Sequence, residues 1–372
     1  MNRKQCIYIR NIVTLIIICN ILYFIFPFPP IFWRLGMSAI GIYVFWKDGQ
    51  KGICTLEKIT LFFIIVNLTY YLTSYIWLDD PTETNLGNTF FCMMSLFIFM
   101  RLGHHKQITE EYITIAAIII VFVSIPRYHY DSISLISYFG RKVFTLNIST
   151  LFLVSLPMLI IIKNKYISFF LLFICISFIF SSAKRGNVVA MIIPIICIVF
   201  YLIKENKNNI FGIVILTIFI IISINYFRQS ITENEYILQR IEQTKNGDDS
   251  NRGMLYSKSW ETWKDSESYS QLFWGHGWDG TVKTIGNRSH NDWLELLVDF
   301  GFFGFFVYFL LIVSFICLIV ETKAKKNRAI LICILYIWLI KSFVSMAYSE
   351  EYLAILFIPI GYIISTNDKQ IY

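Results

Sequence analysis

The border that decides the fold reads Arg288-Ser289-His290-Asn291-Asp292-Trp293-Leu294-Glu295. It closes the one long polar tract of the chain and opens an apolar run over residues 292–320. Ser289 and Asn291 are residue types that cap helices, and an acidic residue stands three positions after Ser289. This run is longer than a bilayer requires, so the sequence predicts a helix whose first turns project from the membrane with His290 at its mouth.

Composition places the whole chain in a membrane. Of its 372 residues 56% are hydrophobic and only 15% are charged, well below the roughly 25% of a soluble domain. The net charge of +7 does not indicate nucleic-acid binding, because the basic residues stand in short tracts between apolar runs. Most of the eight cysteines fall inside apolar runs, a spacing that fits neither a disulfide framework nor a zinc site. We therefore expect an all-α polytopic membrane protein.

The apolar runs predict about twelve transmembrane helices, since each crossing needs about 20 apolar residues. Domain boundaries follow at residues 1–228 (nine spans), 229–291 (a large polar loop with short amphipathic helices) and 292–372 (three spans). The runs are 11–27, 31–46, 58–78, 87–102, 111–126, 145–162, 166–183, 187–203, 209–227, 292–320, 328–347 and 350–366.

The distribution of lysine and arginine predicts the orientation. With the N-terminus inside, seventeen of the 32 basic residues fall in inner tracts and five in short outer loops. Cytoplasmic loops carry such an excess, so both termini are expected in the cytoplasm and the large loop outside it. Aromatic residues at helical spacing in that loop, Tyr256, Trp260 and Trp263, indicate a helix lying along the membrane surface.

Three groups of polar residues at the outer border are candidates for chemistry. Lys184 and Arg185 follow the seventh span, where the bias rule disfavours positive charge, and a snorkelling pair without a role is the alternative. Arg252 would share a helix face with Tyr256, or it is a solvated loop arginine. The guanidinium of arginine suits phosphate because it donates two parallel hydrogen bonds.

His290 is the candidate general base. A helix N-terminus disfavours the imidazolium and attracts anions, so a neutral imidazole there could accept a proton beside a bound phosphate. A structural cap-region histidine is the alternative. Arg288 and Asn291, on either side of it, are further candidates for binding the substrate.

No metal or other cofactor is expected. The acidic pairs Asp79-Asp80 and Asp248-Asp249 have no histidine at ligand spacing, and a lone acidic pair is usually a solvated turn. The chain has no phosphate-binding lysine motif, so ATP coupling is not indicated either.

These residues resemble the O-antigen ligase and polymerase superfamily of bacterial inner membranes. The resemblance rests on the layout of spans and loop, on His290-Asn291 followed by Gly301-x-x-Gly304, on Gly275-x-Gly277, and on Ser182-Ala183-Lys184-Arg185-Gly186. Two positions depart from the family pattern: Lys184 replaces a serine or threonine, and Phe305 stands where ligases often have a small hydroxyl residue. Ligase and polymerase both stay open.

The resemblance implies a metal-independent glycosyltransferase of lipopolysaccharide biosynthesis. Its donor would be a glycan on undecaprenyl pyrophosphate, held by Arg185 and Arg252, with His290 as the base. The acceptor would be the lipid A core for a ligase, or a second lipid-linked repeat unit for a polymerase, which could also have a chain-length regulator as partner.

Two other classes fit less well. A transporter or flippase of lipid-linked sugars needs charged groups along a path at mid-bilayer depth, whereas the charges here gather at the outer border. A metal-dependent transferase of the dolichol-phosphate type would carry an acidic pair in its first outer loop, which here is a Pro-Phe-Pro-Pro run.

Overall fold

The computed structural model describes residues 1–25, 29–48, 54–77, 83–139, 146–182, 184–204 and 252–367. The ninth predicted span, residues 209–227, lies outside these ranges, as do the two acidic pairs and residues 229–251 of the large loop. Every regular element among the described residues is a helix. In chain order they are α1 (Arg3–Ile21), α2 (Pro30–Asp48), α3 (Thr55–Trp77), α4 (Glu83–His104), α5 (Glu110–Phe139), η1 (Asn147–Ser149), α6 (Thr150–Leu159), α7 (Lys165–Ser181), α8 (Arg185–Ala190), α9 (Ile192–Lys204), α12 (Arg252–Lys264), α13 (Tyr269–Trp274), α14 (Gly280–Ile285), α15 (Asp292–Glu321), α16 (Lys325–Val344), α17 (Leu353–Leu356) and α18 (Ile358–Thr366).

The described apolar runs are helical, but α1 begins and ends nearer the N-terminus than the run 11–27, and α5 extends to Phe139, beyond the run 111–126. Seven helical stretches in the described part are long and apolar enough to cross a membrane, and three shorter apolar helices accompany them. The described part of the chain is therefore that of an all-helical membrane protein, while the total of twelve spans and the three-part division stay predictions. The fourth run, 87–102, is α4, one of the most deeply buried helices.

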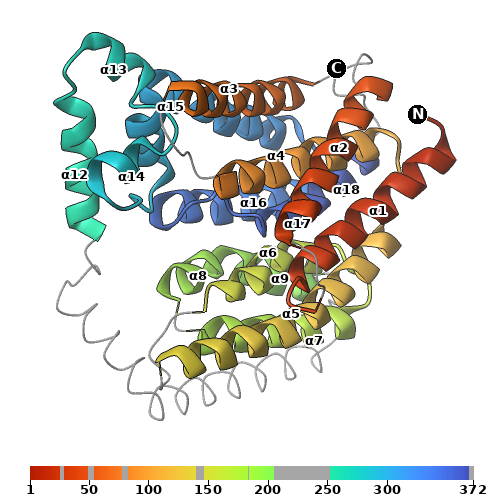
Figure 1. Ribbon diagram of the computed structural model, residues 1–372. Coiled ribbons are helices and arrows are strands. Elements are labelled where there is room, and N and C mark those ends of the chain that lie inside the picture. Colours follow the sequence, from red (N-terminus) through yellow and green to blue (C-terminus); the bar gives the residue numbers. More distant parts are fainter. Residues whose placement is uncertain are drawn as a thin grey trace.

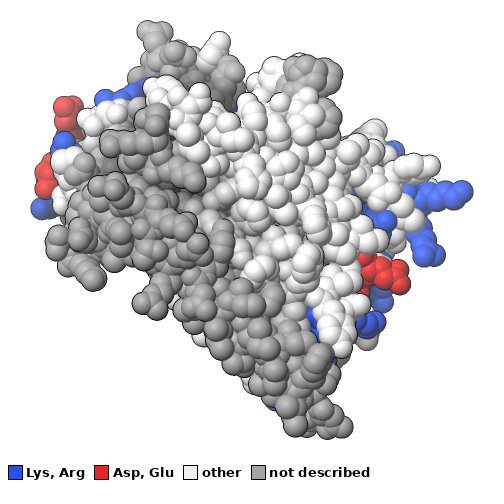
Figure 2. Space-filling model, turned by 90° about the horizontal axis from the view of Figure 1, so that it is seen from below, with Lys and Arg blue, Asp and Glu red and all other residues white. Residues whose placement is uncertain are grey.

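Apolar side chains cover the outside of the bundle as well as its interior. Residues such as Trp46, Ile65 and Val320 are exposed, the last to 70% of its surface. Figure 2 shows a broad surface without charged side chains between charged groups at its two sides. Such a belt fits a lipid environment, because contact with hydrocarbon costs these side chains nothing.

The loop helices α12, α13 and α14 cover one end of the bundle, and α12 runs across the direction of α3, α4 and α16 (Figure 1). All three pack against α15. We call this the capped end. At the opposite end the Met1 amine lies 3.3 Å from Asp48 Oδ1, and Ser365 Oγ donates to Gly103 O. The first and last described helices therefore share this opposite end; whether it faces the cytoplasm stays a prediction.

Candidate functional site

Hydrogen bonds fix the loop helices on the capped end. The Tyr256 hydroxyl on α12 donates to the carbonyl of Phe343 at the end of α16, over 2.8 Å. The Trp278 amide donates to Ser74 Oγ on α3, over 2.7 Å. Arg252, as the first residue of α12, is thereby held at a defined place near the starts of α8 and α15.

Two glycines let the loop cross α15. Gly275 and Gly301 have positive φ angles of 76° and 65°, and Gly301 breaks α15 into two pieces. A Cβ on Gly275 would lie 2.4 Å from Gly301 N, and a Cβ on Gly301 would lie 2.5 Å from Gly275 N. The amides of His276 and Gly277 donate to the carbonyls of Val298 and Asp299 just before the break. The sequence predicted an unbroken apolar helix; the close backbone crossing is the reason for the break.

The start of α15 is capped by Asn291. Its side-chain oxygen accepts from the amides of Trp293 and Leu294, as expected for an N-cap, and its Nδ2 donates to Phe343 O. The expected pairing of Ser289 with Asp292 does not form. Ser289 instead donates from its amide and hydroxyl to Glu295, and the Asp292 carboxylate accepts from the Ala347 amide.

Arg288 is held between two carboxylates. Its guanidinium contacts Glu295 Oε1 at 2.9 Å and Asp279 Oδ1 at 2.7 Å. Beside them, Asp299 accepts from the amide and hydroxyl of Thr281. These contacts fasten the loop before His290 to α14 and α15, so the charge of Arg288 is already balanced within the protein.

His290 directly precedes the N-cap of α15 and has an exposed side chain. Its backbone is left-handed, with φ of 55°, a conformation that histidine adopts more readily than most residues. Partial burial and the positive charges of Arg252, Arg288 and Lys184 hold the pKa of His290 below its usual value. At neutral pH the imidazole is therefore uncharged and able to accept a proton.

Lys184 lies half-buried beside a second lysine. Burial, the Lys341 ammonium and Arg252 lower the pKa of Lys184 to about 7, although the Glu350 carboxylate opposes this shift. Lys184 therefore changes charge near neutral pH unless an anion binds beside it. A bound anion would raise this pKa and keep the ammonium form.

Below Lys184 a polar network joins four segments. The Lys341 ammonium on α16 contacts Glu350 Oε2 at 3.1 Å and Thr150 Oγ1 at 3.3 Å. Asn187 on α8 donates to Ser149 Oγ and to the same Thr150 hydroxyl. The sequence analysis gave Lys341 and Glu350 no role. The available signal was a lysine inside an apolar run, which is rarely placed there without a partner.

The structure thus brings together three of the predicted cationic residues and the histidine, since Lys184, Arg252 and Arg288 all act on His290. Arg185 follows Lys184 and begins α8. Asn291 lies next to the group as the helix cap. Arg252 forms no ion pair with any residue in the part of the chain that the structure describes.

The arrangement can bind an anion and accept a proton. Positive side chains stand beside the N-terminus of α15, where the helix dipole also favours negative charge. Within the described residues, the side chains that could share a metal ion lie at the opposite end of the bundle. The expectation of a metal-independent reaction stays a prediction.

One comparison with known proteins matches the region of the chain that contains these residues. The family model of O-antigen ligase matches residues 169–309, which include every candidate from Lys184 to Asn291 but neither Lys341 nor Glu350. No curated protein matched the chain. The match over residues 169–309 supports the O-antigen ligase and polymerase superfamily.

Proposed function

We propose that the protein is an O-antigen ligase-type glycosyltransferase of the bacterial inner membrane. It would move a glycan from undecaprenyl pyrophosphate to a sugar hydroxyl of the lipid A core, at the periplasmic face. The observation that carries this proposal is the meeting of Lys184 and Arg252 with an uncharged His290 at the start of α15. The family match supplies the reaction class.

The donor pyrophosphate would lie among Arg252, Lys184 and Arg185. Arg252 has no carboxylate partner among the described residues, so its fork is available to a phosphoryl group. Lys184 would become fully charged as the anion binds. Neutralising the pyrophosphate makes it a good leaving group, so the protein need not supply a general acid.

His290 would take the proton of the acceptor hydroxyl. Its lowered pKa keeps the base form present at neutral pH, and its side chain is exposed, so an acceptor could reach it. Because Arg288 and Asn291 are committed to Glu295, Asp279 and the helix amides, we assign them to shaping the loop around His290 and only secondarily to substrate contact.

An O-antigen polymerase is the second candidate, and Phe305 favours it. The Phe305 ring packs 5.5 Å from the Trp293 ring, close to the start of α15, at a position where ligases often have a small hydroxyl residue. A large apolar ring there would suit an acceptor different from the ligase's core sugar. Nothing else in the described part of the chain separates the two reactions.

Surface glycan from a deletion strain tests the proposal and separates the candidates. For a ligase, the lipid A core loses all polymer, and polymer accumulates on the lipid carrier. For a polymerase, single repeat units cap the core. A strain whose lipopolysaccharide and lipid-linked glycans both match those of the parent would overturn both assignments.

A further inference from the structure

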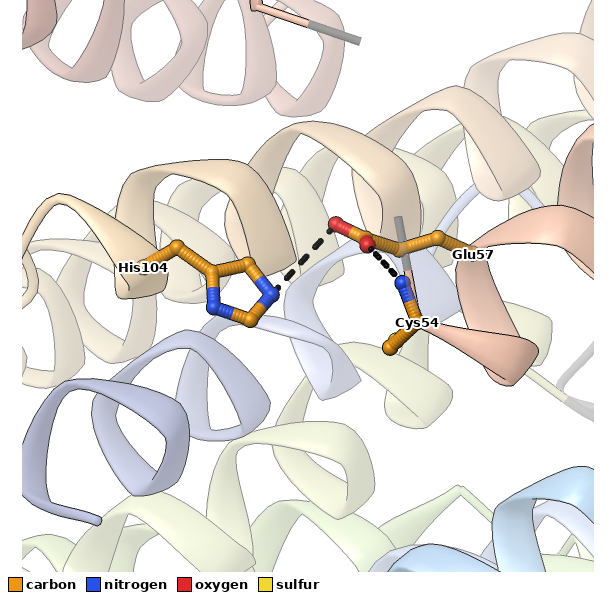
Figure 3. A group of neighbouring side chains, drawn as sticks. All are labelled: Cys54, Glu57 and His104. Carbon is orange, nitrogen blue, oxygen red and sulfur yellow. Dashed lines mark hydrogen bonds and ion pairs between the residues drawn. The ribbon is translucent and has the colours of Figure 1, made fainter. Parts of the chain in front are cut away.

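A second group of polar side chains lies at the opposite end of the bundle. Cys54 directly precedes α3, Glu57 lies in its first turn, and His104 is the last residue of α4. Figure 3 shows the His104 ring and the Glu57 carboxylate pointing toward each other, with Cys54 beside them. The proposed transfer reaction uses none of these residues. Cys54 and Glu57 are three positions apart, but His104 lies far from both in sequence, so cysteine spacing alone gave no sign of the group.

The three side chains offer ligand atoms at distances that one small ion could bridge. The Cys54 sulfur, a Glu57 oxygen and a His104 nitrogen all lie within 4.8 Å of one another, and Nε2 of His104 is 3.7 Å from Oε1 of Glu57. A tetrahedral zinc ion with bonds of about 2.0–2.3 Å separates its ligand atoms by about 3.3–3.7 Å.

Two of these ligand atoms lack a hydrogen bond within the described part of the chain. Glu57 is fully buried, yet its Oε1 has no hydrogen-bond partner, and neither has Nε2 of His104. They face each other at a separation too long for a hydrogen bond. Buried polar groups are rarely left in this way, so such atoms require an explanation. An ion between them would satisfy both.

The neighbouring charges leave room for a cation. Oε2 of Glu57 accepts from the Cys54 amide at 2.9 Å and lies 3.5 Å from Arg101. Arg101 is more closely paired with Asp48, at 3.0 Å, and Asp48 also contacts His105 at 2.7 Å. Oε1 of Glu57 therefore lies near the His104 imidazole and the Cys54 thiol. Sulfur, nitrogen and oxygen ligands together suit zinc better than magnesium or calcium, which prefer oxygen alone.

We propose that Cys54, Glu57 and His104 form a zinc site that fastens the start of α3 to the end of α4. The thiol would lose its proton on binding, and a water molecule would complete the tetrahedron. The site would lie at the opposite end from His290 and would hold together two helices of the bundle.

Cobalt titration of the full chain tests this site. The protein is purified without a polyhistidine tag, stripped with chelator and titrated with Co²⁺ in detergent micelles. We expect one ion per chain, with the sulfur-to-cobalt charge-transfer absorption of a thiolate ligand and the visible bands of tetrahedral cobalt, both removed by added Zn²⁺. Zn²⁺ should also raise the thermal midpoint of the stripped protein.

Variants separate the site from adventitious binding. Cys54→Ser and His104→Gln should each weaken binding by more than about tenfold, since loss of a ligand exceeds the usual effect of an outer-shell change. His105→Gln is the matched control, because His105 is the adjacent histidine but contacts Asp48 instead; it should bind cobalt like the parent. Glu57→Gln also disturbs the contact with Arg101, so the other two variants decide. Equal binding by Cys54→Ser and the parent, or an absence of thiolate absorption, would leave an ordinary His104–Glu57 pair and overturn the proposal.

Discussion

Single residues at the capped end divide into those already paired within the protein and those available to a ligand. Arg288 forms ion pairs with Asp279 and Glu295, whereas Arg252 has no ion-pair partner among the described residues. An available cation gains most when an anion arrives, because it gives up no existing pair. Arg252 should therefore contribute more to donor affinity than Arg288 does.

Arg252→Lys keeps the charge and loses the planar fork. We expect donor affinity to fall by about tenfold or more, since a bidentate pair becomes a single contact. Binding of a lipid pyrophosphate to the purified protein measures this. Lys258→Met, at an exposed lysine on the same helix, is the control and should bind like the parent. Parental affinity in Arg252→Lys would rule out recognition by the fork.

His290→Asn removes the base and keeps the backbone, because asparagine tolerates the left-handed conformation that His290 adopts. The transfer rate should fall by about 10²–10⁴-fold, as is usual when a general base is lost, while donor affinity changes little. Comparison with His290→Ala shows how much of the loss in transfer rate comes from a disturbed backbone. Normal transfer in the asparagine variant would exclude a catalytic histidine, and loss of donor binding alone would make His290 a phosphate ligand.

Lys184 predicts a pH dependence. In the unliganded protein its pKa is lowered to about 7, so the ammonium is present below this pH and lost above it. Because the charged form binds the donor, kcat/KM should fall as the pH rises through about 7. On the acidic side, kcat/KM should fall only at a pH below the usual pKa of histidine, since the pKa of His290 is also lowered.

Lys184→Arg tests this assignment, because arginine stays charged throughout the range. Its kcat/KM profile should lose the fall near pH 7 and keep the acidic limb. Lys184→Met should give low values at every pH. A parental profile in Lys184→Arg would assign the alkaline limb to another group.

At the scale of elements, the Gly275–Gly301 crossing places the loop on α15. The break in α15 frees the carbonyls of Val298 and Asp299, and the loop amides of His276 and Gly277 use them. The loop is thus fastened by backbone contacts that no side chain specifies. The glycines were visible in the sequence as a family pattern, but their physical role requires two segments to meet.

Alanine at either glycine should destabilise the protein strongly. A Cβ at Gly275 or at Gly301 would lie 2.4 Å from the nearest backbone atom, and both residues have positive φ. Gly286→Ala is the control, because Gly286 also has positive φ but has open space around it, so it should cost only about 1–2 kcal/mol. Thermal unfolding in detergent measures all three. Equal losses in Gly286→Ala and Gly301→Ala would show that the crossing adds nothing.

At the scale of the whole molecule, the apolar runs predicted where helices lie but not which helices pack against one another. The run 292–320 is α15, and the run 187–203 is α8 with α9, because burial in lipid requires every backbone group to bond within its own helix. Arg252 and His290 were predicted as site residues from residue type and position at a helix start, and their roles stay predictions. The Lys341–Glu350 pair was not, since its meaning depends on which helices pack together at Lys184.

The orientation of the bundle decides which compartment holds His290. The capped end carries the long loop, and the opposite end carries the start of α1 and the tracts rich in lysine and arginine. A cytoplasmic excess of basic residues predicts that the capped end is periplasmic. Two exposed residues can carry a cysteine that reports the orientation. Asn287 lies in the loop beside His290, and Lys323 lies in the turn between α15 and α16.

Labelling with a membrane-impermeant maleimide reads this orientation directly. In cells with a permeabilised outer membrane and an intact inner membrane, Asn287→Cys should react and Lys323→Cys should not. Lysis should make the second site reactive, and the parent chain measures the background from its own cysteines. The reverse pattern would place His290 in the cytoplasm. A lipid-linked glycan presented at the periplasmic face would then be out of its reach, and the proposed transfer would fail, whereas a zinc site at the opposite end would still be open to test.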